Sequence, residues 1–99
     1  MNAYETQAVR HRHKIGWQDE YIVGMVSREQ PLNTTGVFKI AEAEGVMSQA
    51  TTHKYLKRVV AKKFVQEKAV KLDKRTLELT LTEKGKHFLQ EIKNVYVGK

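Results

Sequence analysis

Residues 48–60 read Ser-Gln-Ala-Thr-Thr-His-Lys-Tyr-Leu-Lys-Arg-Val-Val and divide, at helical spacing, into two chemically different faces. With 3.6 residues per turn, the residues expected to pack inward recur at offsets of three and four: Thr52, Tyr55, Leu56 and Val59. The opposite face is small, polar or cationic: Gln49, Ala50, His53, Lys54 and Lys57. Ser48 can cap the first turn with its hydroxyl. We expect a helix over 48–62 whose outer face can read base edges and grip phosphates, although an ordinary amphipathic surface helix also fits these residues.

The preceding segment predicts a partner helix over about residues 35–44. Asn33, Thr34 and Thr35 supply N-cap candidates. The residues expected to face inward are Val37, Ile40, Ala41 and Glu44. Gly45 should end this helix in the left-handed conformation, which costs glycine little, and Val46 should return to the core. Two helices joined by a short glycine turn form a helix-turn-helix, with the second helix in the reading position.

The segment after the reading helix predicts a β-hairpin. Residues 64–65 enter an extended stretch, and residues 76–81 alternate strictly, with Leu77, Leu79 and Leu81 expected inward. Residues 71–75 would form the tip, and Lys71, Lys74 and Arg75 make it cationic. A basic hairpin that follows a helix-turn-helix is a wing, although a plain solvated hairpin is the alternative.

With the flanking segments, the expected fold is a winged helix-turn-helix, which is mainly helical with a small β-hairpin (α+β). We divide the chain into three parts: residues 1–16, 17–82 and 83–99. The first is expected to be a basic N-terminal arm or a short helix. Residues 17–29 should form a helix that ends before Pro31, with Trp17 as a core anchor and Leu32 in a short strand or bridge. Thr82 should cap the last helix, whose apolar stripe is expected to serve packing and dimerisation: Phe88, Leu89, Ile92, Val95 and Tyr96.

Composition excludes several classes of protein. The 99 residues contain no cysteine, no apolar run long enough to cross a membrane and no signal-peptide core, so we expect a soluble cytoplasmic (nucleoid-associated) protein with no membrane partner. His11 and His13 lack a third ligand, so no metal site is expected. Paired carboxylates, a phosphate loop and a nucleophile–base set are missing as well. We therefore expect neither an enzyme nor a cofactor.

The net charge of +7 is concentrated in one segment. Residues 54–75 hold nine Lys or Arg against Glu67 and Asp73, a net of 9 − 2 = +7, whereas the rest of the chain is balanced at nine against nine. A concentrated basic footprint is typical of nucleic-acid binding, because neutralised phosphates release condensed counterions.

These residues resemble the winged-helix domain of the multiple-antibiotic-resistance regulator (MarR) family over about residues 35–90. The resemblance rests on Ile40-Ala41, Gly45-Val46, Ser48, Lys57-Arg58-Val59, and the run Asp73-x-Arg75 … Leu81-Thr82-x-x-Gly85. It implies that Arg75 enters the minor groove and that Asp73 pairs with and orients this arginine. It also implies that Gln49, Ala50, His53 and Lys54 face the major groove.

The chain departs from the family pattern at three positions. Met47 resembles an extra residue in the turn, Thr52 replaces an aliphatic residue, and Lys63 replaces the glycine before the wing. We therefore expect the end of the reading helix to be built differently. The family's terminal helices shelter an effector pocket, for which this chain has little material, so a small-molecule effector is not expected.

The leading hypothesis is a sequence-specific regulator, such as a repressor, that binds double-stranded DNA as a homodimer. The expected contacts are Thr34, Thr35, Ser48, Gln49, Ala50, His53, Lys54, Lys57, Lys71, Lys74 and Arg75, with Asp73 orienting the wing. The alternative is a winged-helix protein-interaction module of a transcription or replication complex, because an acidic partner can use the same cations.

The charge distribution predicts duplex binding that weakens steeply with salt. About six phosphate contacts give a log–log slope of affinity against salt of roughly −5. Titration of a DNA duplex across a salt series measures this slope. A flat dependence, or no binding at low salt, would contradict the electrostatic interpretation.

Overall fold

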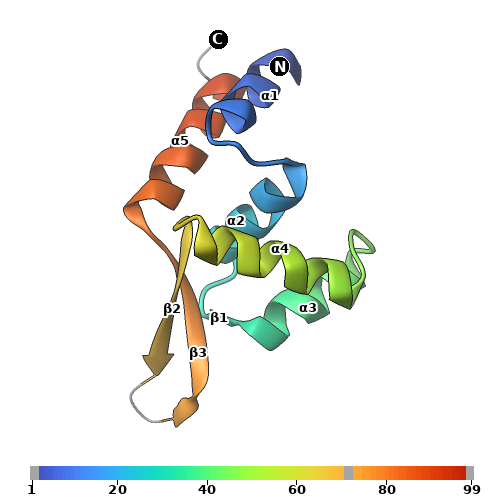
Figure 1. The fold of residues 1–99 in the computed structure, drawn as a ribbon, viewed down its shortest axis with the longest axis vertical. Helices are drawn as coiled ribbons and strands as arrows, with labels where there is room; N and C mark the ends of the chain where they lie inside the picture. Colours follow the sequence, from blue (N-terminus) through green and yellow to red (C-terminus); the bar gives the residue numbers. More distant parts are fainter. Residues whose placement is uncertain (1–2, 71–72, 98–99) are drawn as a thin grey trace.

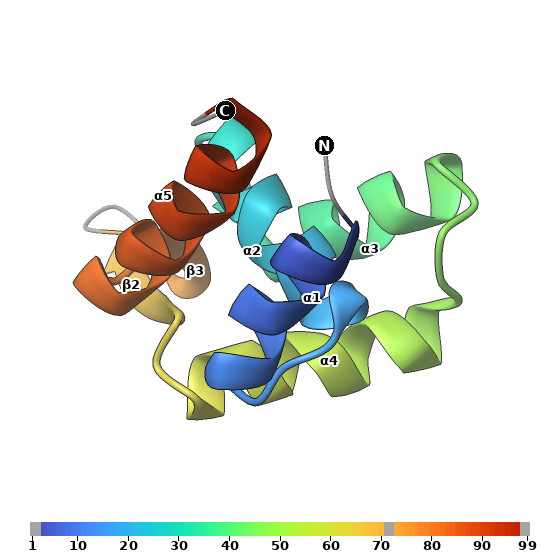
Figure 2. The same ribbon diagram turned by 90° about the horizontal axis from the view of Figure 1, so that it is seen from above.

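The chain forms five helices and a small three-stranded antiparallel sheet (Figure 1). This computed structural model describes residues 3–70 and 73–97, with side chains over 5–68 and 77–95. The elements are α1 (Ala3–Arg12), α2 (Trp17–Arg28), β1 (Leu32–Asn33), α3 (Thr34–Ala43), α4 (Gln49–Ala61), β2 (Val65–Val70), β3 (Asp73–Leu81) and α5 (Glu83–Val97). Both termini lie at one end of the molecule, and the β2–β3 hairpin extends from the opposite end. Figure 2 shows α4 along one side of the molecule, and Figure 1 shows that α3 packs against it.

The helix-turn-helix is built from local capping interactions, as the sequence predicts. The Asn33 side chain accepts a hydrogen bond from the Gly36 N–H at 2.8 Å and begins α3. Gly45 has φ of +67° and ends α3 in the left-handed conformation. Ser48 then caps α4 by accepting from the Thr51 N–H at 3.3 Å. Within α3, Val37 and Ala41 are buried as expected.

Three inward placements predicted for this region differ in the structure. Glu44 is exposed, and its carboxylate accepts a hydrogen bond from the Tyr21 hydroxyl. Val46 is only half-buried, because the turn after Gly45 lies at the edge of the core. Trp17, predicted to anchor the core, is 51% exposed, since it is the first residue of α2 and lies at the end of the helix packing.

The wing has strand order β1-β3-β2, with Leu32 opposite Leu79. Leu79 is fully buried and Leu81 is half-buried, but Leu77 is 38% exposed because it lies farther along the hairpin, beyond most of the helical layer. The predicted tip was too long, since β3 already begins at Asp73 and pairs there with Val70.

Two aromatic rings pack together in the core, one from just before the β2–β3 hairpin in the sequence and one from the helix after it. Phe64, which follows α4, and Phe88 of α5 are fully buried, with ring centres 5.5 Å apart. The imidazole of His13 meets both rings edge-on. The other large buried side chains come from α2, α3, α4 and the sheet: Ile22, Val23, Met25, Val26, Val37, Val59, Val65 and Leu79.

The base of the wing is joined tightly to α5. The Thr82 N–H donates to the Phe64 carbonyl at 3.1 Å, and its hydroxyl accepts from the Gly85 N–H at 3.1 Å, so Thr82 caps α5 as predicted. A Cβ at Gly85 would lie 2.1 Å from the Phe64 carbonyl oxygen. Glycine is therefore required here by the close approach of two backbones.

Lys63 ends α4 in the manner of a glycine. Lys63 has φ of +70°, in the left-handed region that glycine adopts most easily at the end of a helix. Its N–H donates to the Val60 carbonyl, and the next N–H, from Phe64, donates to Val59. The chain therefore keeps the left-handed turn with a side chain that disfavours it.

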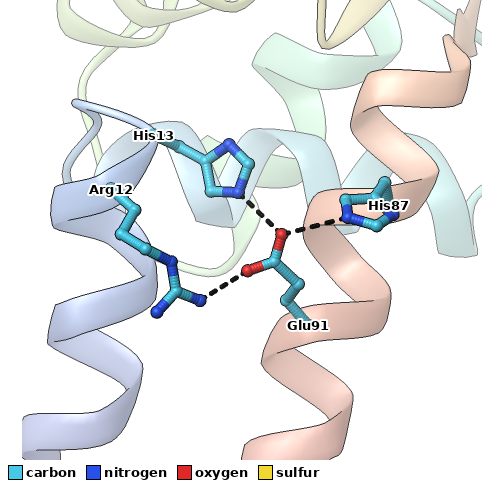
Figure 3. Close-up of polar contacts among 4 residues, drawn as sticks. All are labelled: Arg12, His13, His87 and Glu91. Carbon is cyan, nitrogen blue, oxygen red and sulfur yellow. Dashed lines mark hydrogen bonds and ion pairs between the residues drawn. The ribbon is translucent and has the colours of Figure 1, made fainter.

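Of the two alternatives predicted for residues 1–16, an arm or a short helix, the structure has the helix α1. The basic residues at its end and in the turn after it are tied to the body by ion pairs. Arg10 pairs with Glu20 at 2.9 Å. Glu91 of α5 accepts from Arg12 Nη2 at 2.6 Å and lies 3.1 Å from His13 Nε2, as Figure 3 shows. His87 approaches the same carboxylate at 3.4 Å. The Arg12 hydrogen bond holds the pKa of Glu91 below its ordinary value.

Replacing Lys63 by glycine should stabilise the fold. A left-handed non-glycine residue costs about 1–2 kcal/mol, and glycine offsets part of this gain through unfolded-state entropy. We expect a net gain of about 0.5–1 kcal/mol, or roughly 4 °C in melting temperature. Lys63→Ala is the control, because it removes the cation but keeps the strained conformation. Equal stabilisation by both variants would show that charge is the cause.

Replacing Glu91 by glutamine should destabilise the fold by about 1–2 kcal/mol at neutral pH. Because the folded-state pKa of Glu91 is depressed, its contribution is complete above the ordinary value of 4.5 and disappears as the pH falls through the folded value. The gap between parent and variant in denaturant melts should therefore close on acidification. Glu83→Gln, at a carboxylate that is 93% exposed, is the control and should change little at any pH.

Candidate nucleic-acid interface

The two faces of α4 are separated as the sequence predicts. Thr52, Leu56 and Val59 are buried, and Tyr55 packs partly against the core. The Thr52 hydroxyl donates to the Ser48 carbonyl at 2.8 Å, which satisfies the polar group at a position where the family has an aliphatic residue. The candidate contact residues of the opposite face are all exposed: Gln49, Ala50, His53, Lys54 and Lys57.

Ser48 differs from its neighbours because its hydroxyl is already engaged. It accepts from the Thr51 N–H and lies 3.0 Å from the Thr51 hydroxyl. Its side chain thus has a structural role at the start of α4. Any contact with a ligand would have to share these hydrogen bonds.

A shallow groove of about 580 Å³ runs between the start of α3 and the start of α4. Thr34 and Phe38 line it from α3, and Gln49, Ala50 and His53 line it from α4. Thr35 is exposed at the same end of α3. The structure thus brings Thr34 next to the outer face of α4, whereas Thr35 does not line the groove.

Phe38 is the groove residue that the sequence interpretation missed. Its half-buried ring meets the imidazole of His53 edge-on, with centres 5.9 Å apart. The available signal was its spacing, since Phe38 follows the candidate residue Thr34 by one helical turn.

The wing residues are less fully described. Asp73, Lys74 and Arg75 begin β3 at the far end of the hairpin, and Lys71 lies outside the described residues. The side chains of Asp73, Lys74 and Arg75 also lie outside the description. Pairing of Asp73 with Arg75 therefore stays a prediction.

Arg58 and Lys62, which belong to the basic segment 54–75, bind groups of the protein itself. Arg58 Nε lies 3.3 Å from the buried carboxylate of Asp19, and its Nη2 donates to the Lys14 carbonyl at 3.2 Å. Lys62 Nζ donates to the same carbonyl at 3.0 Å. Among the described side chains of this segment, Lys54, Lys57, Lys63 and Lys68 are exposed and have no carboxylate partner. The surface charge available to a ligand is thus smaller than the sequence count.

Within the described residues, no group of three or more His, Asp or Glu side chains has an arrangement that would hold a metal ion. None of the described helices combines the length and apolar character that a membrane crossing requires.

Comparison with known proteins identifies the fold. No protein-family model and no curated protein sequence matches the chain. Among solved structures, the S. aureus MepR–DNA complex matches 94% of this chain and 67% of its own, with a TM-score of 0.80 at 17% identity. The transcriptional regulator Tm0710 from Thermotoga maritima matches 92% of this chain and 61% of its own, with a TM-score of 0.72 at 20% identity. A MarR transcriptional regulator from Methanosarcina mazei Go1 matches 94% of this chain and 64% of its own, with a TM-score of 0.70 at 19% identity.

The structural neighbours are thus MarR-type winged-helix regulators, and the predicted winged helix-turn-helix is confirmed. At these identities the likeness establishes the fold. The chain spans about 61–67% of the length of these solved proteins.

Proposed function

We propose that this protein is a sequence-specific regulator of transcription that binds double-stranded DNA. The main observation in support is the outer face of α4, which is exposed, polar and cationic and adjoins the start of α3. A helix with such a face fits the major groove, where each base pair presents a distinct pattern of donors and acceptors. The MepR structure with a similar fold was solved as a DNA complex, which adds support.

The proposed contacts divide into reading and gripping. Gln49, His53 and Lys54 read base edges, because their side chains are exposed on one face of α4. The proposed backbone contacts are Thr34, Thr35, Lys57, Lys71 and Lys74. Arg75, oriented by Asp73, would occupy the minor groove beside the hairpin.

The protein would act as a homodimer joined through its terminal helices. In support, α1 and α5 lie side by side at the end that carries both termini, away from the hairpin (Figure 1). A two-fold partner there would leave both α4 helices free, and one turn of DNA requires them about 34 Å apart. Such a dimer would act at a promoter either by occlusion, as a repressor, or by recruitment.

One observation favours the second candidate, a protein-interaction module. The indole of Trp17 is 51% exposed beside a shallow pocket that also contains Ala8 and Ile15. Exposed aromatic side chains are frequent anchors of protein interfaces. This surface differs from the α4 face, so the two functions can be tested separately.

Alanine variants distinguish reading from gripping. His53→Ala or Lys54→Ala should cost about 1–3 kcal/mol on the preferred duplex and less on a scrambled one. Lys57→Ala should weaken both duplexes alike and reduce the salt slope by about one. The measurement is a paired titration, with the preferred duplex first recovered from random DNA by the full chain.

Two results would contradict the proposal. Equal losses on both duplexes for His53→Ala and Lys54→Ala would show that α4 does not read sequence. Recovered duplexes without two-fold symmetry, together with a monomer in light scattering, would contradict the dimer.

A further inference from the structure

The groove between α3 and α4 combines apolar and polar side chains. Phe38 and Ala50 supply apolar atoms, and Thr34, Gln49 and His53 supply polar ones. Ala50 is exposed and carries only a methyl group, so it leaves the groove open. A partly exposed aromatic ring is unusual beside the otherwise polar face of α4.

The polar groups of the groove are available to a ligand. In the described part of the chain, neither the Gln49 amide nor the ring nitrogens of His53 have a hydrogen-bond partner. The edge-on contact with Phe38, with ring planes at 75°, restricts the orientation of the His53 ring. Phe38 therefore has two effects on the exposed face of α4. It adds an apolar surface beside that face, and it holds the His53 ring in position.

The chemistry of the groove matches one kind of base pair. In the major groove, thymine presents a methyl group, which alanine and phenylalanine side chains contact favourably. Its partner adenine presents an acceptor and a donor side by side, which a glutamine amide can satisfy together. The exposed cations Lys54 and Lys57 on the same helix face favour a polyanion over an uncharged or basic partner.

We infer that this groove recognises a T·A base pair, with the thymine methyl on Phe38 and Ala50 and the adenine edge on Gln49. The inference rests on the proposed function, because it requires α4 to enter the major groove. It adds a specificity-determining residue, Phe38, that comes from α3 rather than from the reading helix.

Single replacements of thymine by deoxyuridine test the inference. This change removes the methyl group and leaves the hydrogen-bonding edge intact. In the preferred duplex recovered from random DNA, replacing one particular thymine in each half-site should lower the protein's affinity for the duplex about fourfold. This is the factor expected for exposing one buried methyl group. The other thymines should show no change.

Variants then assign the effect to the groove. Phe38→Ala should lose most of the difference between the thymine and deoxyuridine duplexes, keeping only the part that Ala50 supplies. Its salt slope should be unchanged, and thermal melting checks that it folds. Phe38→Leu keeps an apolar side chain and should preserve most of the difference. Lys39→Ala, at an exposed neighbour on α3, is the matched control and should preserve all of it.

The possible failures are distinguishable. If no thymine is sensitive in the parent protein, or if folded Phe38→Ala retains the full sensitivity, the inference is wrong. In either case, sequence-dependent duplex binding would leave the proposed function intact. Absence of any sequence preference would contradict the proposed function itself, and this inference with it.

Discussion

A buried carboxylate on α2 forms an ion pair with α4, the helix that carries the candidate contact residues. The Asp19 side chain is only 1% exposed, and such a charge is very costly unless it is paired. One of its oxygens accepts from the Gly16 N–H at 2.9 Å, and the other lies 3.3 Å from Arg58 of α4 without a hydrogen bond of its own. Because α2 packs against α4, this pair fixes the orientation of the helix that carries the candidate contact residues. The outer face of α4 can then vary without loss of the fold.

Arg58 also shows why charge counts overestimate a binding surface. From the sequence, Arg58 and Lys62 belong to the basic segment and are indistinguishable from the residues around them. In the structure, both donate to the Lys14 carbonyl, and Lys14 has φ of +58° in the turn between α1 and α2. Periodicity predicts which face of a helix is exposed. It does not predict which distant part of the chain packs against the end of that helix.

Prediction from sequence succeeded where the cause is local. Asn33, Gly45 and Ser48 act on backbone groups within a few residues, so caps and turns could be placed before the structure was known. It failed for Trp17 and Leu77, whose apolar character predicts burial but whose positions at the ends of elements leave them partly exposed. The exposed face of α4 was predicted for the same local reason. Phe38 was missed because its role depends on packing between two helices.

The close contact between Gly85 and the Phe64 carbonyl joins the β2–β3 hairpin to α5, so the two elements should move together. Thr82 alone separates β3 from α5, and its hydrogen bonds leave little slack between them. Because β3 pairs with β1 at Glu78 and Leu79, the part that extends freely is residues 73–77, an arm of roughly 16 Å at about 3.3 Å per residue. A tilt of α5 by about 10° would therefore displace the far end of the hairpin by roughly 3 Å, close to the 3.4 Å spacing of successive bases along a strand. Small changes in how the terminal helices pack would thus appear, enlarged, at the opposite end of the molecule.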